Sequence, residues 1–139
     1  MLYPFQTKLL MNHEQDQLGV LLVNTGSPSK PNTISIRRYL KEFLLDKRII
    51  QLPRVIWLPI LYLFILPFRP IKKIYNYKKI WMNEGSPLLV YAKRLLQKLN
   101  ASKSKKDNMY IQIAMRYGEP NIKKKLIIFK EKKIKLLKS

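Results

Sequence analysis

The chain has 139 residues, no cysteine and a single histidine, His13. These counts exclude disulfides, thiolate metal sites and any multi-histidine metal site built from this chain alone. The length suits one modest domain with its own core. Residues 1–11 lack the long apolar region and small-residue cleavage site of a secretory signal, so we expect a cytoplasmic protein.

The net charge of +20 comes from 28 Lys and Arg residues against 8 Asp and Glu residues, and the lysines are densest at 103–106 and 123–138. Such a charge is either an electrostatic footprint for nucleic acid or an anionic membrane, or a set of lysines on solvated faces. No nucleic-acid module accompanies the charge, and aromatic residues do not alternate with the lysine runs as a stacking surface requires. We therefore favour solvated lysines and expect no nucleic-acid partner.

The first half of the chain begins with residues 1–17, which we expect to be an irregular leader. Residues 18–24 form a short apolar run rich in Val and Leu, typical of a strand buried on both faces. The Gly, Ser and Pro of residues 25–31 indicate a loop. Asn32 or Thr33 then caps a helix that is expected to run to about residue 45.

The next segment, IIQLPRVIWLPILYLFILPF, raises the question of a membrane. Its uncharged run between Arg54 and Arg69 is interrupted by Pro59 and Pro67 and is short of the ~20 residues that span a bilayer. We expect a buried or interfacial helix that begins near Arg54 and can contact a membrane surface or an apolar ligand.

Two further helices are predicted before the second strand. Residues 71–81 carry apolar side chains at helical spacing. After the turn NEGSPLL, Ser86 is expected to cap a helix whose first position is Pro87 and which continues to about Asn100.

The remaining elements are a strand at residues 109–115, a loop at 116–120 and a helix entered at Asn121. A third strand is expected to begin at residues 134–137. Alternation of strands and helices favours a parallel sheet, in which ligands bind beyond the carboxyl ends of the strands. The loops so placed are residues 24–31 and 116–120, and a sheet of so few strands indicates the front part of a larger domain.

Neither strand-end loop pairs a nucleophile with a histidine, so the residues alone indicate binding rather than catalysis. Arg116, Arg69, Tyr77 and Ser86 are groups that together suit a carboxylate-bearing ligand, because arginine holds carboxylates with two donors and a helix N-terminus offers free N–H groups. Structural roles compete with this interpretation, since Arg69 can cover a helix boundary, Tyr77 can pack and Ser86 can simply cap a helix.

Five blocks of the sequence, in order and at matching spacings over roughly residues 18–126, resemble the ferrochelatase family. They are GVLLVNTGSP, IRRYLKEFLLDKRIIQLPR, ILPFRP, IYNYKKIWMNEGSPLLVY and AMRYGEPNIKKKL. The family inserts ferrous iron into a porphyrin in haem biosynthesis. The resemblance implies an α/β, Rossmann-like (chelatase-like) parallel sheet with flanking helices, here the incomplete N-terminal part of a two-domain fold with the porphyrin in a cleft.

The resemblance also implies a set of porphyrin-binding residues. The NTGSP loop would lie against the macrocycle, and the apolar segment between Val55 and Phe68 would form part of the lip of the cleft. By this resemblance the porphyrin-binding positions are Asn24, Thr25, Gly26, Arg69, Tyr77, Ser86 and Arg116. No tightly bound cofactor is implied, because ferrous iron and the porphyrin (protoporphyrin IX or coproporphyrin III) are substrates of the full-length family.

The sequence departs from the family in what it lacks. The family's catalytic histidine and its acidic partner belong to later stretches, beyond residue 139, so no catalytic or metal-binding residue is expected on this chain. We expect a leader (1–17), a partial N-terminal ferrochelatase domain (18–126) and a lysine-rich truncated end (127–139), and a fragment that is inactive alone.

Two other functions stay open at this point. One is a porphyrin-binding module without catalysis. The other is a basic protein peripheral to a membrane, with contact through the segment between Val55 and Phe68. In that case the expected location is the cytoplasm together with the surface of the inner membrane.

Overall fold

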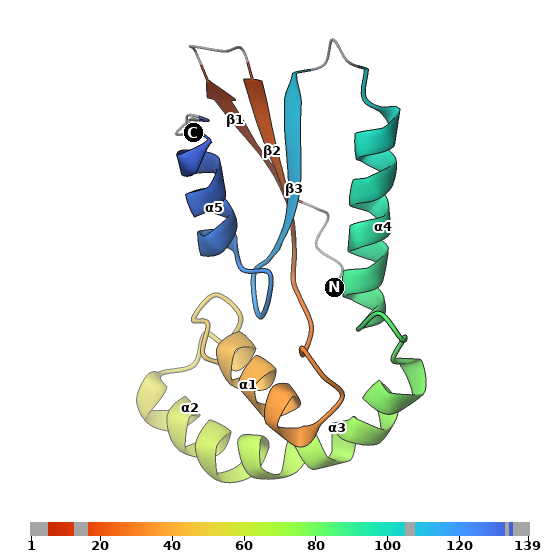
Figure 1. Ribbon diagram of the computed structural model, residues 1–139. Helices are drawn as coiled ribbons and strands as arrows, with labels where there is room; N and C mark the ends of the chain where they lie inside the picture. Colours follow the sequence, from red (N-terminus) through yellow and green to blue (C-terminus); the bar gives the residue numbers. More distant parts are fainter. Residues whose placement is uncertain (1–5, 13–16, 105–107, 133, 135–139) are drawn as a thin grey trace. The chain divides into compact units, whose positions relative to one another are not determined.

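The computed structural model describes residues 6–12, 17–104, 108–132 and 134 (Figure 1). Backbone contacts divide the chain into two compact units. The sheet unit comprises Met1–Gly26 together with Tyr91–Ser139, and the helical unit comprises Ser27–Val90. Each is described by itself below.

The sheet unit is built on three strands, β1 (Gln6–Asn12), β2 (Gln17–Asn24) and β3 (Met109–Met115), in the order β1-β2-β3. β2 and β3 are parallel, with a register that runs from Leu18 opposite Met109 to Asn24 opposite Met115. The two predicted strands and their parallel pairing are therefore confirmed. Helix α4 (Pro87–Ser102) precedes β3, and helix α5 (Ile122–Glu131) follows it.

The expectation that residues 1–17 are irregular is wrong for Gln6–Asn12 and for Gln17. β1 pairs with β2 in an antiparallel register, from Gln6 opposite Val23 to Asn12 opposite Gln17, so the sheet is mixed and not purely parallel. The pairing satisfies an edge of β2 whose N–H and C=O groups would otherwise be open. The strand was missed because QTKLLMN has no clear alternation of polar and apolar residues.

The core of the sheet unit lies between the sheet and α5, which runs beside the strands in Figure 1. Phe129 of α5 is fully buried against Leu21 of β2 and Ala114 of β3. Its ring meets Tyr110 edge to face, with centroids 5.4 Å apart. Edge-to-face contact and complete burial make Phe129 the anchor of this helix.

Helix α5 begins as predicted, because the Asn121 side chain accepts a hydrogen bond from Lys124 N at 2.8 Å. The third strand expected at residues 134–137 falls outside the described residues except for Ile134, which is buried in the core of the sheet unit.

The helical unit starts with α1 (Thr33–Leu44), whose N-cap is Asn32, one of the two residues predicted to cap it. The Asn32 side chain accepts from Ser35 N at 2.8 Å. At the other end, the carbonyl of Leu44 accepts from Trp57 Nε1 at 2.8 Å and that of Leu45 from Arg54 Nη2 at 2.9 Å. Side chains of the next helix thus satisfy the carbonyls that the end of α1 leaves open.

The long helix of this unit differs from expectation. The sequence predicts separate helices around residues 55–68 and 71–81, whereas α2 (Arg54–Ile60), the π-helical turn η1 (Leu61–Ile65) and α3 (Leu66–Ile80) form one continuous helix. In the π turn, Leu66 N donates a hydrogen bond to Leu61 O five residues earlier, whereas each N–H of an α-helix donates to the carbonyl four residues earlier. Pro59 and Pro67, which interrupt the uncharged run, and Pro70 all lie within this helix.

The two faces of this long helix have different neighbours. Leu61 and Leu66 are buried against Leu44 of α1 and form the core of the helical unit. The opposite face carries an exposed apolar stripe in which every third or fourth residue is hydrophobic: Ile56, Ile60, Phe64, Phe68, Ile71 and Tyr75. By length and composition alone, Arg54–Ile80 is also the one helix in the described residues that is able to cross a membrane. Only 17% of its most apolar window is buried, which distinguishes it from the core helix of a soluble domain.

Candidate functional site

The two loops predicted at the carboxyl ends of the strands meet in the sheet unit. Arg116 N donates to Asn24 O at 2.8 Å and Tyr117 N donates to Thr25 O at 2.9 Å, so the parallel pairing continues past the ends of β2 and β3. The Asn24 side chain accepts from Thr25 N at 2.7 Å, which holds the first turn of the loop. These contacts bring Asn24, Thr25, Gly26 and Arg116 to one edge of the sheet.

Gly26 makes this meeting of loops sterically feasible. It is buried, its φ is +103°, and a Cβ placed on it would lie 1.9 Å from the carbonyl oxygen of Tyr117. Any side chain here would force the two loops apart, so the glycine of NTGSP sets their spacing.

The helical unit contains the serine that follows this glycine, and it pairs with the serine of the second GSP sequence. The hydroxyls of Ser27 and Ser86 are hydrogen-bonded to each other. Ser86 is buried, and its Oγ also accepts from Leu89 N at 3.3 Å, which confirms it as the cap of α4. The hydroxyl of Ser86 is therefore already engaged in holding the backbone of this unit.

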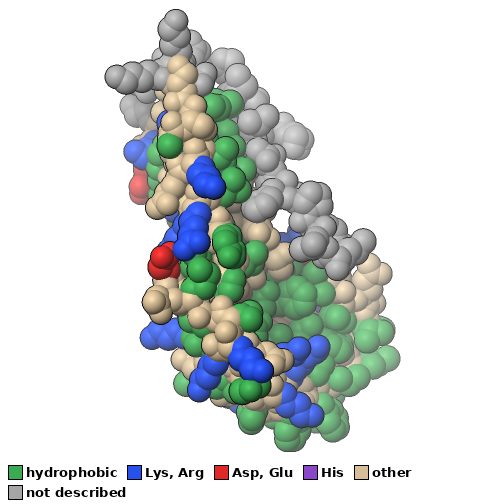
Figure 2. Space-filling model, turned by 90° about the vertical axis from the view of Figure 1, so that its right-hand side faces the viewer, with side chains coloured by type: hydrophobic (Ala, Val, Ile, Leu, Met, Phe, Trp, Pro, Cys, Tyr) green, Lys and Arg blue, Asp and Glu red, His purple; other side chains and the backbone are tan. Residues whose placement is uncertain are grey.

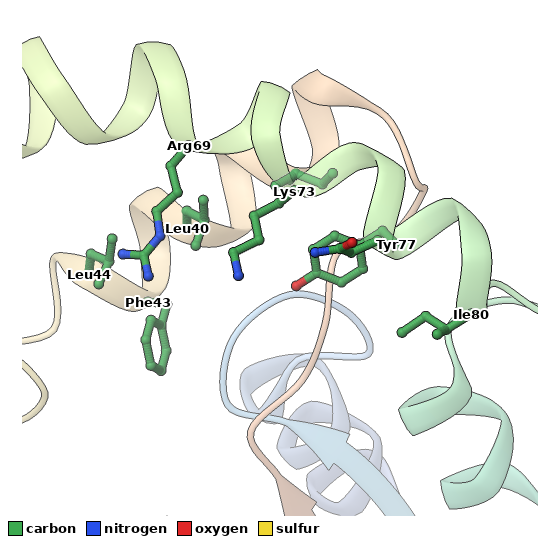
Figure 3. A pocket seen from close by; sticks show the side chains of 9 residues that line it. Leu40, Phe43, Leu44, Arg69, Lys73, Tyr77 and Ile80 are labelled. Carbon is green, nitrogen blue, oxygen red and sulfur yellow. The ribbon is translucent and has the colours of Figure 1, made fainter.

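Between α1 and α3 lies a groove with a volume of about 320 Å³, which we call the α1–α3 groove (Figure 3). Its residues are Ile36, Leu40, Phe43, Leu44, Arg69, Lys73, Asn76, Tyr77 and Ile80. Figure 3 shows Arg69, Lys73 and Tyr77 extending from α3 into the same space that Phe43 enters from α1. Their spacing of four residues places the three on one face of α3.

The α1–α3 groove combines an apolar wall with basic and phenolic groups. Leu40, Phe43 and Leu44 supply the apolar side, whereas Arg69 and Lys73 bring two positive charges to it. Burial raises the pKa of the Tyr77 phenol above its ordinary value of 10.0, so the hydroxyl stays protonated and able to donate. The arrangement suits a flat apolar ligand that carries carboxylates.

The seven predicted binding residues thus fall into groups. Arg69 and Tyr77 line the α1–α3 groove, and the four residues at the strand ends form a second set within the sheet unit. Ser86 is not among the residues that line the groove. Lys73 and Asn76 were not predicted from the sequence. The spacing of Lys73 four residues from both Arg69 and Tyr77 does indicate that it shares their helix face.

Metal ligands do not gather anywhere in the described part of the chain. Within those residues no group of three or more His, Cys, Asp or Glu side chains is placed to hold an ion. His13 itself lies outside the described residues.

Comparison with known proteins identifies the family to which these features belong. The family model described as Ferrochelatase matches residues 17–137, which is most of the chain. The chain belongs to the ferrochelatase family. A mixed α/β fold with parallel β2 and β3 flanked by helices agrees with this assignment.

Curated ferrochelatases share much of this sequence. The ferrochelatase of Sodalis glossinidius is 47% identical over 106 residues, which cover 76% of this chain and 31% of that protein. The ferrochelatase of Alcanivorax borkumensis is 43% identical over 87% of this chain and 36% of its own length, and that of Bordetella pertussis is 44% identical over 84% and 32%. The chain thus spans about a third of the length of these ferrochelatases. No solved structure matched it.

Proposed function

We propose that this chain binds the porphyrin substrate of a ferrochelatase, and that the α1–α3 groove is the part of its helical unit that does so. The single observation that carries the proposal is the convergence of Arg69, Lys73 and Tyr77 on an apolar groove in a member of this family. An apolar macrocycle with carboxylate side chains matches a groove with an apolar wall and two cations.

The contribution of each residue follows from its chemistry. Arg69 and Lys73 are exposed cations that attract carboxylates, while Phe43 and Leu40 offer apolar surface to a ring. Tyr77 donates from a protonated phenol. In the sheet unit, Asn24, Thr25, Gly26 and Arg116 form a second porphyrin-facing set by the same family resemblance, and Ser86 acts by fixing the loop that carries Ser27.

Titration of the chain with protoporphyrin IX or coproporphyrin III tests the porphyrin proposal. Binding is followed by the shift of the Soret band. Lys73→Ala should weaken binding about tenfold, because one charge-assisted contact contributes roughly 1.5 kcal/mol. The matched control is Lys72→Ala, which removes the same charge from the adjacent exposed position outside the groove. Equal losses for the two variants, or no Soret shift with the unaltered chain, would contradict the proposal.

We also propose that these 139 residues do not insert iron by themselves. The reaction requires a base that removes the two pyrrole protons as ferrous iron enters, and distortion of the macrocycle toward the metal. The family resemblance assigns the base to a histidine in a stretch that this sequence does not contain, and the single histidine of the sequence, His13, lies between β1 and β2.

A single-turnover assay with ferrous iron and porphyrin tests this second proposal under anaerobic conditions. We expect porphyrin binding without formation of the metalloporphyrin spectrum. Metal insertion at a rate above that of the buffer, retained in His13→Ala, would show that the chain holds its own catalytic base. The binding titration and the insertion assay fail independently, so each proposal can be rejected alone.

The exposed apolar stripe supports contact with a membrane surface as a further function. Phe64 is 64% exposed and Phe68 58% exposed, and the same helix bears Arg54, Lys72 and Lys79, of which Lys79 places its Nζ 4.4 Å from the centre of the Tyr75 ring of the stripe. An apolar face flanked by basic residues is typical of a helix that lies in the membrane interface. We propose that the long helix docks in this way at the inner face of the cytoplasmic membrane.

Vesicle flotation tests the docking proposal. The chain should float with lipid vesicles, and the double variant Phe64→Glu/Phe68→Glu should not, because charges on the stripe oppose burial in the acyl region. Leu63→Ala/Phe64→Ala is a milder control that lowers apolar area without adding charge. Flotation that is unchanged by the two glutamates would rule out the stripe as the docking face.

A further inference from the structure

A second groove of the helical unit lies on another side of α1 and has no part in the porphyrin proposal. It has a volume of about 510 Å³ and is lined by Ile34, Arg37, Arg38, Lys41, Tyr62, Leu66 and Pro67. We call it the basic groove, because three of its seven residues are cations and none of the seven is acidic. It shares with the α1–α3 groove none of the polar residues assigned above to porphyrin.

The three cations of the basic groove are held in different ways. Arg37 donates from Nε to Leu66 O at 3.0 Å, which fixes its guanidinium against the long helix and leaves its terminal N–H groups for another acceptor. Lys41 Nζ lies 5.6 Å from the centre of the Tyr62 ring, within the range of a cation–π contact. Arg38 is exposed one residue beyond Arg37. Two of the three are thus already positioned without a ligand.

The basic groove adjoins the exposed apolar stripe. Pro67 lines the groove and lies three residues after Phe64 and four before Ile71, a spacing that makes it a neighbour of both stripe residues on the helix surface. Ile34 adds a 69% exposed apolar side chain from the α1 side. Figure 2 shows hydrophobic and basic side chains side by side at the lower end of the view. A ligand with a phosphate in the groove therefore has apolar surface within reach.

We propose that the basic groove binds the phosphate headgroup of an anionic phospholipid when the stripe is docked on a bilayer; this inference rests on the membrane docking proposed above. Arg37 and Arg38 provide guanidinium donors to phosphate oxygens, and Lys41 adds a point charge. The apolar residues around the groove accept the upper part of the acyl chains. Charge complementarity selects a lipid over a second copy of the chain, because two such copies would each present a strongly basic surface.

Vesicle binding with two lipid compositions tests the headgroup site. The probes are phosphatidylcholine vesicles with and without phosphatidylglycerol. The groove variant is Arg38→Ala/Lys41→Ala, which leaves the Arg37 contact to Leu66 in place. The matched control is Lys123→Ala/Lys130→Ala, which removes two exposed charges from α5 in the sheet unit.

The groove variant should lose affinity for the anionic vesicles by roughly tenfold or more, and the control should lose less than about threefold. Both should keep the weaker binding to pure phosphatidylcholine that the stripe provides. Equal losses for the two variants would overturn the headgroup site and leave docking by the stripe intact. The headgroup site would also be overturned if the groove variant bound both compositions like the unaltered chain while Phe64→Glu/Phe68→Glu bound neither. Absence of binding by the unaltered chain would reject docking itself.

Discussion

Arg37 supplies to the carbonyl of Leu66 the hydrogen bond that Pro70 cannot. In an α-helix the carbonyl of residue 66 accepts from the N–H of residue 70, and proline has none. The Arg37 guanidinium, from the neighbouring helix, donates to Leu66 O at 3.0 Å in its place. The contact explains how a helix continues through Pro70, which is itself fully buried.

Replacing Arg37 should therefore destabilise the helical unit in a way that depends on Pro70. Arg37→Ala should lower the free energy of unfolding by about 1–2 kcal/mol, because it leaves the carbonyl unsatisfied. In a Pro70→Ala background the restored N–H should reduce that cost. Urea unfolding of the four chains gives the coupling, with Arg38→Ala as the control expected to stay within about 0.5 kcal/mol. An identical cost of Arg37→Ala in both backgrounds would show that Pro70 is not the reason for the contact.

Gly26→Ala should be far more disruptive than Gly85→Ala. Both glycines have positive φ, +103° and +134°. A Cβ on Gly26 would lie 1.9 Å from Tyr117 O, whereas a Cβ on Gly85 would lie 3.9 Å from its nearest neighbour, Leu89 Cδ2. We expect about 1–2 kcal/mol from backbone strain alone at Gly85 and clearly more at Gly26. Similar losses in thermal unfolding would mean that the loops at the strand ends separate easily.

The Ser27–Ser86 contact predicts unequal costs for the two serines. Ser86→Ala removes both the cap of α4 and the partner of Ser27, so it should lower the free energy of unfolding by about 1–2 kcal/mol. Ser27→Ala removes only the hydroxyl contact and should cost less. In the double variant the two costs should not add, which denaturant titration of all four chains measures. Strict additivity would argue against the hydrogen bond.

The raised pKa of Tyr77 predicts sensitivity to alkaline pH. The phenol ionises more readily in the unfolded chain than in the half-buried folded site, so the folded state binds more protons above pH 10. Stability should fall as the pH rises above the unfolded pKa, with no effect from this group near neutrality. The slope should be shallower in Tyr77→Phe, measured by urea unfolding at several alkaline pH values, with the exposed Tyr75→Phe as the control. Equal slopes for both variants would count against burial of the phenol.

The elements with strong local signals were predictable from sequence. Asn32, Ser86 and Asn121 cap their helices as expected, because a cap requires only one side chain and the backbone beside it. Residues 109–115 are a strand as expected, since β-formers concentrate there. The pairing of the two strand-end loops also followed from topology, because parallel strands end at the same edge of a sheet.

What was missed depends on partners outside the segment concerned. β1 exists through its pairing with β2, and its own residues show no strand pattern. The long helix contains a π turn, and opposite Pro70 the carbonyl of Leu66 accepts a hydrogen bond from Arg37, 29 residues away. Lys73 becomes a groove residue only when α1 packs beside α3. Each of these depends on tertiary contacts that override local propensity.

The hydrogen bond between Ser27 and Ser86 joins residues 59 positions apart. The two ends of the helical unit therefore lie close together, as the ends of an inserted segment do. A segment whose ends already meet can be lengthened, shortened or exchanged without stretching β2 before it or α4 after it, because little chain is needed to close the gap. The length of this segment can thus vary while the register of the sheet stays as it is.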